Sequence, residues 1–215
     1  MEIVRDKNDR WRFARSLFFL NDHYANNDWL QITAGLPPFI RPTQWPERDP
    51  LTRILAWTLM PNHFHLLLQE TKEGGIAKFM QRLGGSMSTC FNAKYKEKGS
   101  LFRGGYKGKT VSKHPHLQYL AFYILVKNVL ELYPGGLASA ARNFNSAWEW
   151  ALNYPFSSLG SYAREETSPI TSDPEDILKR DYKNMRALKQ EAKELIIFHM
   201  NAHGKTFEPI MLENW

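Results

Sequence analysis

The sequence contains a single cysteine, Cys90, among its 215 residues. One thiol cannot close an internal disulfide, so the chain does not belong with disulfide-stapled secreted domains. No apolar run approaches the ~20 residues that a membrane-spanning helix needs. Residues 1–15 mix charges with aromatics and lack the apolar core of a secretory signal. We therefore expect a cytoplasmic protein that has no membrane partner.

Internal repeats and low-complexity tracts are also missing from the sequence. Hydrophobic residues make up 43% of the chain, which is enough for a sizeable core in one domain with an appendage. The formal net charge is +6 and the pI is about 9.3. This basic balance fits either a polyanionic partner or a solvated basic surface, and charge alone does not separate the two.

The order of the expected elements is typical of an α+β fold with helices packed on an antiparallel sheet. Residues 12–20 are short and aromatic-rich, which predicts a first strand, and five prolines in residues 26–50 predict an irregular excursion. Two apolar, β-prone runs flank Met60-Pro61-Asn62, which predicts a strand, a turn and a second strand within residues 53–69. Farther on we expect a helix over 75–95, a turn and strand over 100–111, and helices over 117–132, 138–152 and 175–200. We place a main domain at residues 1–165 and a C-terminal helical extension, outside the main core, at 166–215.

His63 and His65 form the sharpest local feature, separated only by Phe64. Because alternate side chains of a strand face the same side, the two imidazoles project together. Such a pair on a rigid sheet can bind a divalent metal. Taken alone, the pattern also fits two structural histidines that are simply hydrogen-bonded.

Five motifs that occur in one order along the chain favour the metal-binding interpretation of the two histidines. Residues 60–67 (MPNHFHLL) resemble the HUH signature of single-tyrosine transposases, of the insertion-sequence type and the REP-associated type. Four further segments resemble elements of the same family in the same order: 73–76 (EGGI), 99–104 (GSLFRG), 123–132 (YILVKNVLEL) and 154–158 (YPFSS). The resemblance covers roughly residues 12–165, and five ordered motifs are far more specific than any one of them.

The resemblance implies a ferredoxin-like fold whose central strand carries the two histidines. It also implies metal-dependent nicking and strand transfer on single-stranded or hairpin DNA through a 5′-phosphotyrosine intermediate. Mg²⁺ or Mn²⁺ would be held by His63 and His65. Insertion-sequence relatives are typically dimers and REP-associated relatives can be monomers, so a homodimer is one of two states that the resemblance allows.

Tyr123 occupies the position that matches the family's nucleophile. Tyr119 lies one helical turn earlier on the same face and is the alternative, and a purely structural role for both is the third reading. Many relatives carry an amide four residues after the tyrosine as a third metal ligand. Here that residue is Lys127, whose ammonium cannot bind a cation.

Asn128 could supply the missing amide oxygen. On a regular helix a five-residue step turns about 140° away from Tyr123, so Asn128 serves as a ligand only if the helix bulges or ends there. The alternative is a polar helix residue that hydrogen-bonds to the backbone.

Basic residues gather in residues 94–113, where Glu97 is the one acid. Tyr95, Phe102 and Tyr106 are interleaved with them, and phosphate contacts combined with stacking are typical of single-stranded DNA binding. Lys78 and Arg82 on the preceding helix could extend this surface, and a solvated basic face is the alternative. The expected DNA-binding residues are Lys94, Lys96, Arg103, Lys107 and Lys109.

These residues are consistent with three alternative functions. The first is a DNA transposase that cuts with Tyr123 and a bound metal. The second, favoured by Lys127, is a catalytically impaired, domesticated structure-specific DNA-binding protein of the same fold. The third and weakest is an unrelated metallohydrolase, which would form no covalent adduct with DNA.

Overall fold

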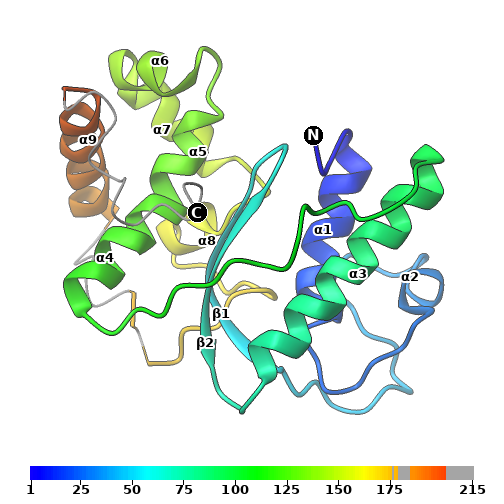
Figure 1. Cartoon of the computed structure of the whole chain (residues 1–215). Helices are drawn as coiled ribbons and strands as arrows, with labels where there is room; N and C mark the ends of the chain where they lie inside the picture. The colour runs from blue at the N-terminus through cyan, green and yellow to red at the C-terminus, as the bar shows by residue number, and fades with distance from the viewer. Residues whose placement is uncertain (176, 179–184, 202–215) are drawn as a thin grey trace. The chain divides into compact units, whose positions relative to one another are not determined.

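The computed structural model describes residues 1–175, 177–178 and 185–201. The chain divides into two compact units (Figure 1). The first consists of Met1–Ile54 and Leu68–Tyr106, and the second of Leu55–Leu67 and Lys107–Trp215. Each unit therefore combines segments that are distant in sequence. The domain boundary that we placed at residue 165 stays a prediction.

Helix α1 (Lys7–Phe19) opens the first unit, where we had expected a strand at residues 12–20. The carboxylate of Asp6 caps this helix by accepting from the N–H of Asp9 at 2.9 Å. Phe13 and Leu17, four residues apart, are both fully buried. The strand prediction is wrong because aromatic content outweighed this helical spacing of the apolar side chains.

Helix α3 (Gly75–Tyr95) packs against α1 and confirms the predicted helix over 75–95. Its buried face consists of Phe79, Leu83, Met87 and Phe91, which recur every fourth residue. The two glycines at the N-terminus of this helix have separate roles. Gly74 adopts a left-handed conformation with φ 72°, and a Cβ on Gly75 would lie 2.1 Å from the carbonyl oxygen of Leu51. The short helix α2 (Trp29–Ile32) completes the helices of this unit in the described residues.

Strands β1 (Thr52–Leu59) and β2 (Phe64–Glu70) form an antiparallel hairpin, as predicted. The N–H of Met60 donates to the carbonyl of His63 at 2.9 Å and closes the turn. The other edge of β1 is joined by residues of the YPFSS motif, through a bridge between Thr58 and Ser157 and a 2.9 Å hydrogen bond from Leu59 N–H to the Phe156 carbonyl. Side chains of the motif add to this pairing: Trp57 N–H donates to the hydroxyl of Ser158 at 2.9 Å, and the hydroxyl of Tyr154 donates to the carbonyl of Leu59 at 3.0 Å.

The described part of the chain contains a mixed helix-and-strand fold whose sheet has two strands. In this part β2 pairs with β1 alone, so a wider ferredoxin-like sheet with the histidine strand at its centre stays a prediction. The strand expected over 100–111 is wrong, because that segment is irregular and mostly exposed. It contains Gly104 at φ 155°, and its few apolar residues do not alternate with polar ones as in a strand with one buried face.

The second unit is mainly helical. The helix expected over 117–132 is present as α4 (His114–Phe122), a π-helical turn η1 (Tyr123–Lys127) and α5 (Asn128–Glu131). The helix expected over 138–152 is divided at Asn143 into α6 (Gly136–Arg142) and α7 (Phe144–Leu152). Helix α8 (Leu159–Ala163) follows the YPFSS motif.

Helix α9 (Met185–Asn201) confirms the helix at the C-terminal side, while residue 176 and residues 179–184 of that expectation lie outside the described residues. Leu188, Ala192 and Ile196 are buried in one core with Val126 and Trp148. The expectation that this helix would lie outside the main core is therefore wrong. Within the described residues, every helix lacks the combination of length and apolar character that crossing a membrane requires.

The packing of α9 predicts a large difference between two adjacent isoleucines. Ile196 is fully buried and Ile197 is 40% exposed. We expect Ile196→Ala to lower the free energy of unfolding by about 2–5 kcal/mol through a buried cavity. Ile197→Ala is the matched control and should change it by less than about 1 kcal/mol. Urea denaturation followed by circular dichroism measures both, and equal effects would contradict the packing of α9 in this core.

Candidate active site

The two histidines lie at the start of β2, in the second unit. His63 ends the hairpin turn and His65 is the second residue of the strand. Their ring centroids are 4.8 Å apart and the rings are nearly perpendicular, at 87°. The pair that the sequence predicted is therefore close together and half-buried.

Asn62 orients one of these imidazoles. Its side-chain oxygen lies 2.7 Å from Nδ1 of His63. Because an amide oxygen only accepts, Nδ1 of His63 carries the proton and donates. The lone pair of that ring is then on Nε2, which is the arrangement found in metal-binding histidines whose other nitrogen is hydrogen-bonded.

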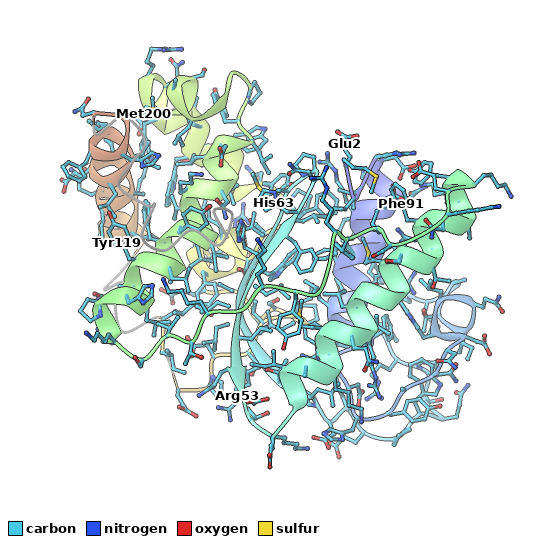
Figure 2. All side chains as sticks on the ribbon, in the orientation of Figure 1. Glu2, Arg53, His63, Phe91, Tyr119 and Met200 are labelled. Atoms are coloured by element: carbon cyan, nitrogen blue, oxygen red, sulfur yellow. The ribbon has the colours of Figure 1, made fainter. Side chains whose placement is uncertain are left out.

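Tyr123 lies against this pair. Its ring makes an edge-to-face contact with His65, with centroids 5.3 Å apart at 84°. The side chain is 1% exposed. Tyr119 is on the preceding α4, away from His63 in Figure 2, and burial raises its pKa. The contact with His65 therefore favours Tyr123 over Tyr119 as the functional tyrosine.

The helix that carries Tyr123 changes its hydrogen bonding at this residue. The N–H of Asn128 donates to the carbonyl of Tyr123, five residues earlier, and the segment between them is π-helical. In this geometry a five-residue step completes roughly one turn. The bulge that would bring Asn128 back to the side of Tyr123 is therefore present.

A bulge of this kind displaces backbone carbonyls from their usual partners. The carbonyl of Ile124, inside the π turn, accepts a short hydrogen bond from the hydroxyl of Thr58 on β1. Thr58 is fully buried. The strand next to the histidine strand therefore holds the π turn in place.

The side chain of Asn128 is buried at 1% exposure. Within residues 1–175, 177–178 and 185–201, neither its amide nitrogen nor its amide oxygen has a hydrogen-bond partner. A buried amide left in this way costs about 1–3 kcal/mol. No described residue supplies the backbone contact that the alternative reading of Asn128 requires, so its oxygen is available to a ligand.

Lys127 contacts the same tyrosine. Its ammonium lies 5.0 Å from the ring centroid of Tyr123 and 2.7 Å from a carboxylate oxygen of Glu131. His199 on α9 is also close, and its pKa is lowered by burial and by the charge of Lys127, against an opposite effect of Glu131. The Lys127 charge is therefore compensated by an ion pair one turn along the helix.

Sequence reasoning missed Asn62, Glu131 and His199. Asn62 is part of the histidine motif at residues 60–67, and Glu131 follows Lys127 at the four-residue spacing of helical ion pairs, so both could have been found. Nothing in the sequence indicated His199, because it lies near Lys127 only through the packing of α9. The described residues contain no cluster of three or more His, Cys, Asp or Glu side chains that could hold a metal. A metal at the histidine pair would therefore need a different third donor, such as the Asn128 amide.

The predicted DNA-binding residues fall in both units. Lys94, Lys96 and Arg103 belong to the first, and Lys107 and Lys109 to the second. All five are exposed. Four of them lie on the irregular segment after α3 or at its beginning, where Lys96 is the left-handed C-cap of the helix.

Lys94 differs from the others because it is held by two carboxylates. Its ammonium lies 2.6 Å from Asp6 and 2.8 Å from Asp9. Burial raises the pKa of Asp9, but hydrogen bonds from Lys94 and Tyr95 outweigh this effect and lower it from 3.8 to about 2. Lys94 therefore ties α3 to the N-terminus of α1, while its contact with DNA stays a prediction.

The histidine pair on the hairpin and the adjoining ring of Tyr123 are consistent with the resemblance to single-tyrosine HUH transposases. Residues 48–126, less than half of the chain, match the family model described as “Transposase IS200 like”. This match supports the predicted family over that segment, and with it transposase function and DNA binding in general. The matched segment includes His63, His65 and Tyr123 and ends just before Lys127. No curated protein and no solved structure matched the chain.

The Lys94 cluster predicts a specific pH dependence. A carboxylate whose pKa is lower in the folded state adds stability above its unfolded pKa and loses it as the pH falls toward the folded value. We expect the Asp9 contribution, about 2 kcal/mol at most, to disappear between about pH 4 and pH 2, and Lys94→Gln to reduce this loss. Lys98→Gln, an exposed charge nearby, is the control. Identical stability profiles for wild type and Lys94→Gln would contradict the structural role.

Proposed function

We propose that this chain is a metal-dependent transposase that nicks and rejoins single-stranded DNA through a 5′-phosphotyrosine on Tyr123. The observation that carries the proposal is the contact of the Tyr123 ring with His65 beside the π turn. This contact brings the ring of Tyr123, which carries the one hydroxyl in residues 123–132, against His65 and supports its role as the nucleophile. The family match supports the same reaction class.

His63 and His65 would hold Mg²⁺ or Mn²⁺, with the amide oxygen of Asn128 as the third donor. The buried and unsatisfied amide of Asn128 and the orientation of His63 by Asn62 fit such an ion. When bound, the ion would polarise the scissile phosphate and offset its developing negative charge.

Tyr123 performs the substitution itself. Its Oη attacks phosphorus, the bond between phosphorus and the 3′-oxygen breaks, and the phenolic proton passes to the leaving 3′-oxygen, which becomes a free 3′-hydroxyl. One phosphodiester is exchanged for another, so a free 3′-hydroxyl can reverse the step without ATP. Because Tyr123 is 1% exposed, DNA reaches its hydroxyl after the covering side chains move.

One observation favours a second candidate, a DNA-binding protein of this fold that no longer cuts. Lys127 stands where many relatives carry an amide, and its ammonium lies over the Tyr123 ring. A cation this near the histidine pair opposes a metal ion by charge repulsion. Its ion pair with Glu131 reduces that repulsion, which is why we place the active enzyme first.

Tyr123→Phe should eliminate the covalent adduct while folding and DNA affinity stay close to wild type. The substitution keeps the aromatic volume and removes the one atom that bonds to phosphorus. Incubation with labelled hairpin-flanked single-stranded DNA and Mn²⁺, followed by denaturing electrophoresis, measures the adduct. Tyr119→Phe is the control and should retain it. Loss of the adduct in Tyr119→Phe alone would transfer the role to Tyr119, and an adduct in both variants would exclude this mechanism.

His63→Ala and His65→Ala should each abolish cleavage and leave most DNA affinity, because phosphate contacts supply binding. Asn128→Ala should raise the Mn²⁺ concentration needed for half-maximal metal binding, on the order of tenfold. Titration of free Mn²⁺ by electron paramagnetic resonance measures metal binding without DNA. Asn145→Ala, an exposed amide on α7, is the control for Asn128. Normal cleavage by either histidine variant would refute the assignment.

A further inference from the structure

The first unit contains three arginines near one buried residue, Asp22. Arg41 lies 2.9 Å from a side-chain oxygen of Asp22, and a guanidinium nitrogen of Arg82 donates to the backbone carbonyl of the same residue. Arg48 is near enough for the charges of both Asp22 and Arg41 to act on its pKa. The side chain of Asp22 is 3% exposed and that of Arg41 14%. The one buried carboxylate of Asp22 therefore acts on Arg41 and Arg48, while Arg82 binds the backbone of the same residue.

The charges of this cluster do not balance. A guanidinium cannot lose its proton in a protein, so burial does not neutralise it. Burial lowers the pKa of Arg48, Asp22 raises it and Arg41 lowers it further. Within the described residues, Nε of Arg48 is buried and has no hydrogen-bond partner. A half-buried cation in this state requires a counter-charge.

Asp49, whose backbone lies beside the carboxylate of Asp22, is already engaged in another ion pair. The backbone N–H of Asp49 donates to Asp22, but the two carboxylate oxygens of Asp49 each lie 2.7 Å from the ammonium of Lys72. Asp49 therefore neutralises Lys72. The excess positive charge around Asp22 is left for a ligand.

Two of these arginines, Arg41 and Arg48, each contact an aromatic ring. The guanidinium of Arg48 lies 4.5 Å from the ring of Phe18, and that of Arg41 lies 5.8 Å from the ring of Trp45. Tyr24 contacts Trp45 with ring centroids 5.2 Å apart, and both rings are half-buried. Planar cationic forks suit a phosphate group, and neighbouring aromatic rings suit a stacked base.

We propose that Arg41 and Arg48 bind a backbone phosphate of single-stranded DNA, with Trp45 and Tyr24 as the stacking surface for an adjacent base. Asp22 holds the fork of Arg41 in place, Arg82 binds the backbone of Asp22, and Phe18 packs against the fork of Arg48. This site belongs to the first unit, whereas Tyr123 and the histidine pair belong to the second. That the anion is DNA rests on the proposed function, and the need for an anion rests on the cluster alone.

The test measures binding of a fluorescein-labelled ten-nucleotide oligothymidylate to the full chain by anisotropy at several salt concentrations. We expect Arg48→Gln to weaken binding about tenfold at low salt and to reduce the slope of log K against log salt by about 0.7, which corresponds to one phosphate. Arg41→Gln should act in the same way. Arg48→Lys should keep the slope and lose part of the affinity, because it keeps the charge and loses the fork.

Lys72→Gln is the matched control, since it removes one positive charge from the same unit at an exposed ion pair. It should bind as wild type does. Near-ultraviolet circular dichroism establishes that each variant is folded, and if the glutamine variants are not, Arg48→Lys decides the outcome. Wild-type affinity and slope in the folded Arg48 and Arg41 variants would overturn the proposal, as would a loss of affinity in Lys72→Gln equal to theirs.

Two further measurements separate this site from the proposed function and from free phosphate. Covalent adduct formation is assayed in parallel: DNA binding through Arg48 without any adduct would refute the nickase and leave this site standing. Inorganic phosphate is tested by its effect on the melting temperature. Stabilisation by phosphate in wild type but not in Arg48→Gln, with no oligonucleotide binding, would assign the site to the free ion and overturn its role in DNA binding.

Discussion

The candidate active site depends on one hydrogen bond, from the N–H of Asn128 to the carbonyl of Tyr123. This five-residue closure turns a helix segment into a π turn and inserts one residue between the tyrosine and the amide. A regular helix would point Asn128 away from Tyr123. The π turn offsets this rotation, as the proposed role of Asn128 as third metal ligand requires.

The neighbouring hairpin stabilises this turn and aligns the site. Thr58 on β1 satisfies the carbonyl of Ile124 that the π turn exposes, while β2 presents His65 to the ring of Tyr123. On the other edge of β1, the backbone of the YPFSS motif pairs next to Thr58. The histidine motif, the tyrosine helix and the YPFSS motif therefore form one hydrogen-bonded assembly, although they are distant in sequence.

Three groups of basic residues in the described part of the chain lie in different environments. Those on the irregular segment after α3 are exposed to solvent, and Lys94 and Lys127 are held by nearby carboxylates. The arginines around Asp22 exceed the negative charge available to them. Net charge indicated a polyanionic partner without distinguishing these cases, because the energy of a cation is set by burial and by its neighbours.

The sequence by itself determined the hairpin, the helix over 75–95, the pairing of His63 with His65 and the family resemblance, since each rests on local spacing or on an ordered motif. Only the tertiary structure decided the rest. Residues 12–20 became helix once Phe13 and Leu17 could bury one face against α3, and α9 joined the core through residues more than sixty positions from Val126. The π turn needed a hydroxyl from Thr58, far away in the chain. Such outcomes depend on long-range contacts, which local sequence patterns do not encode.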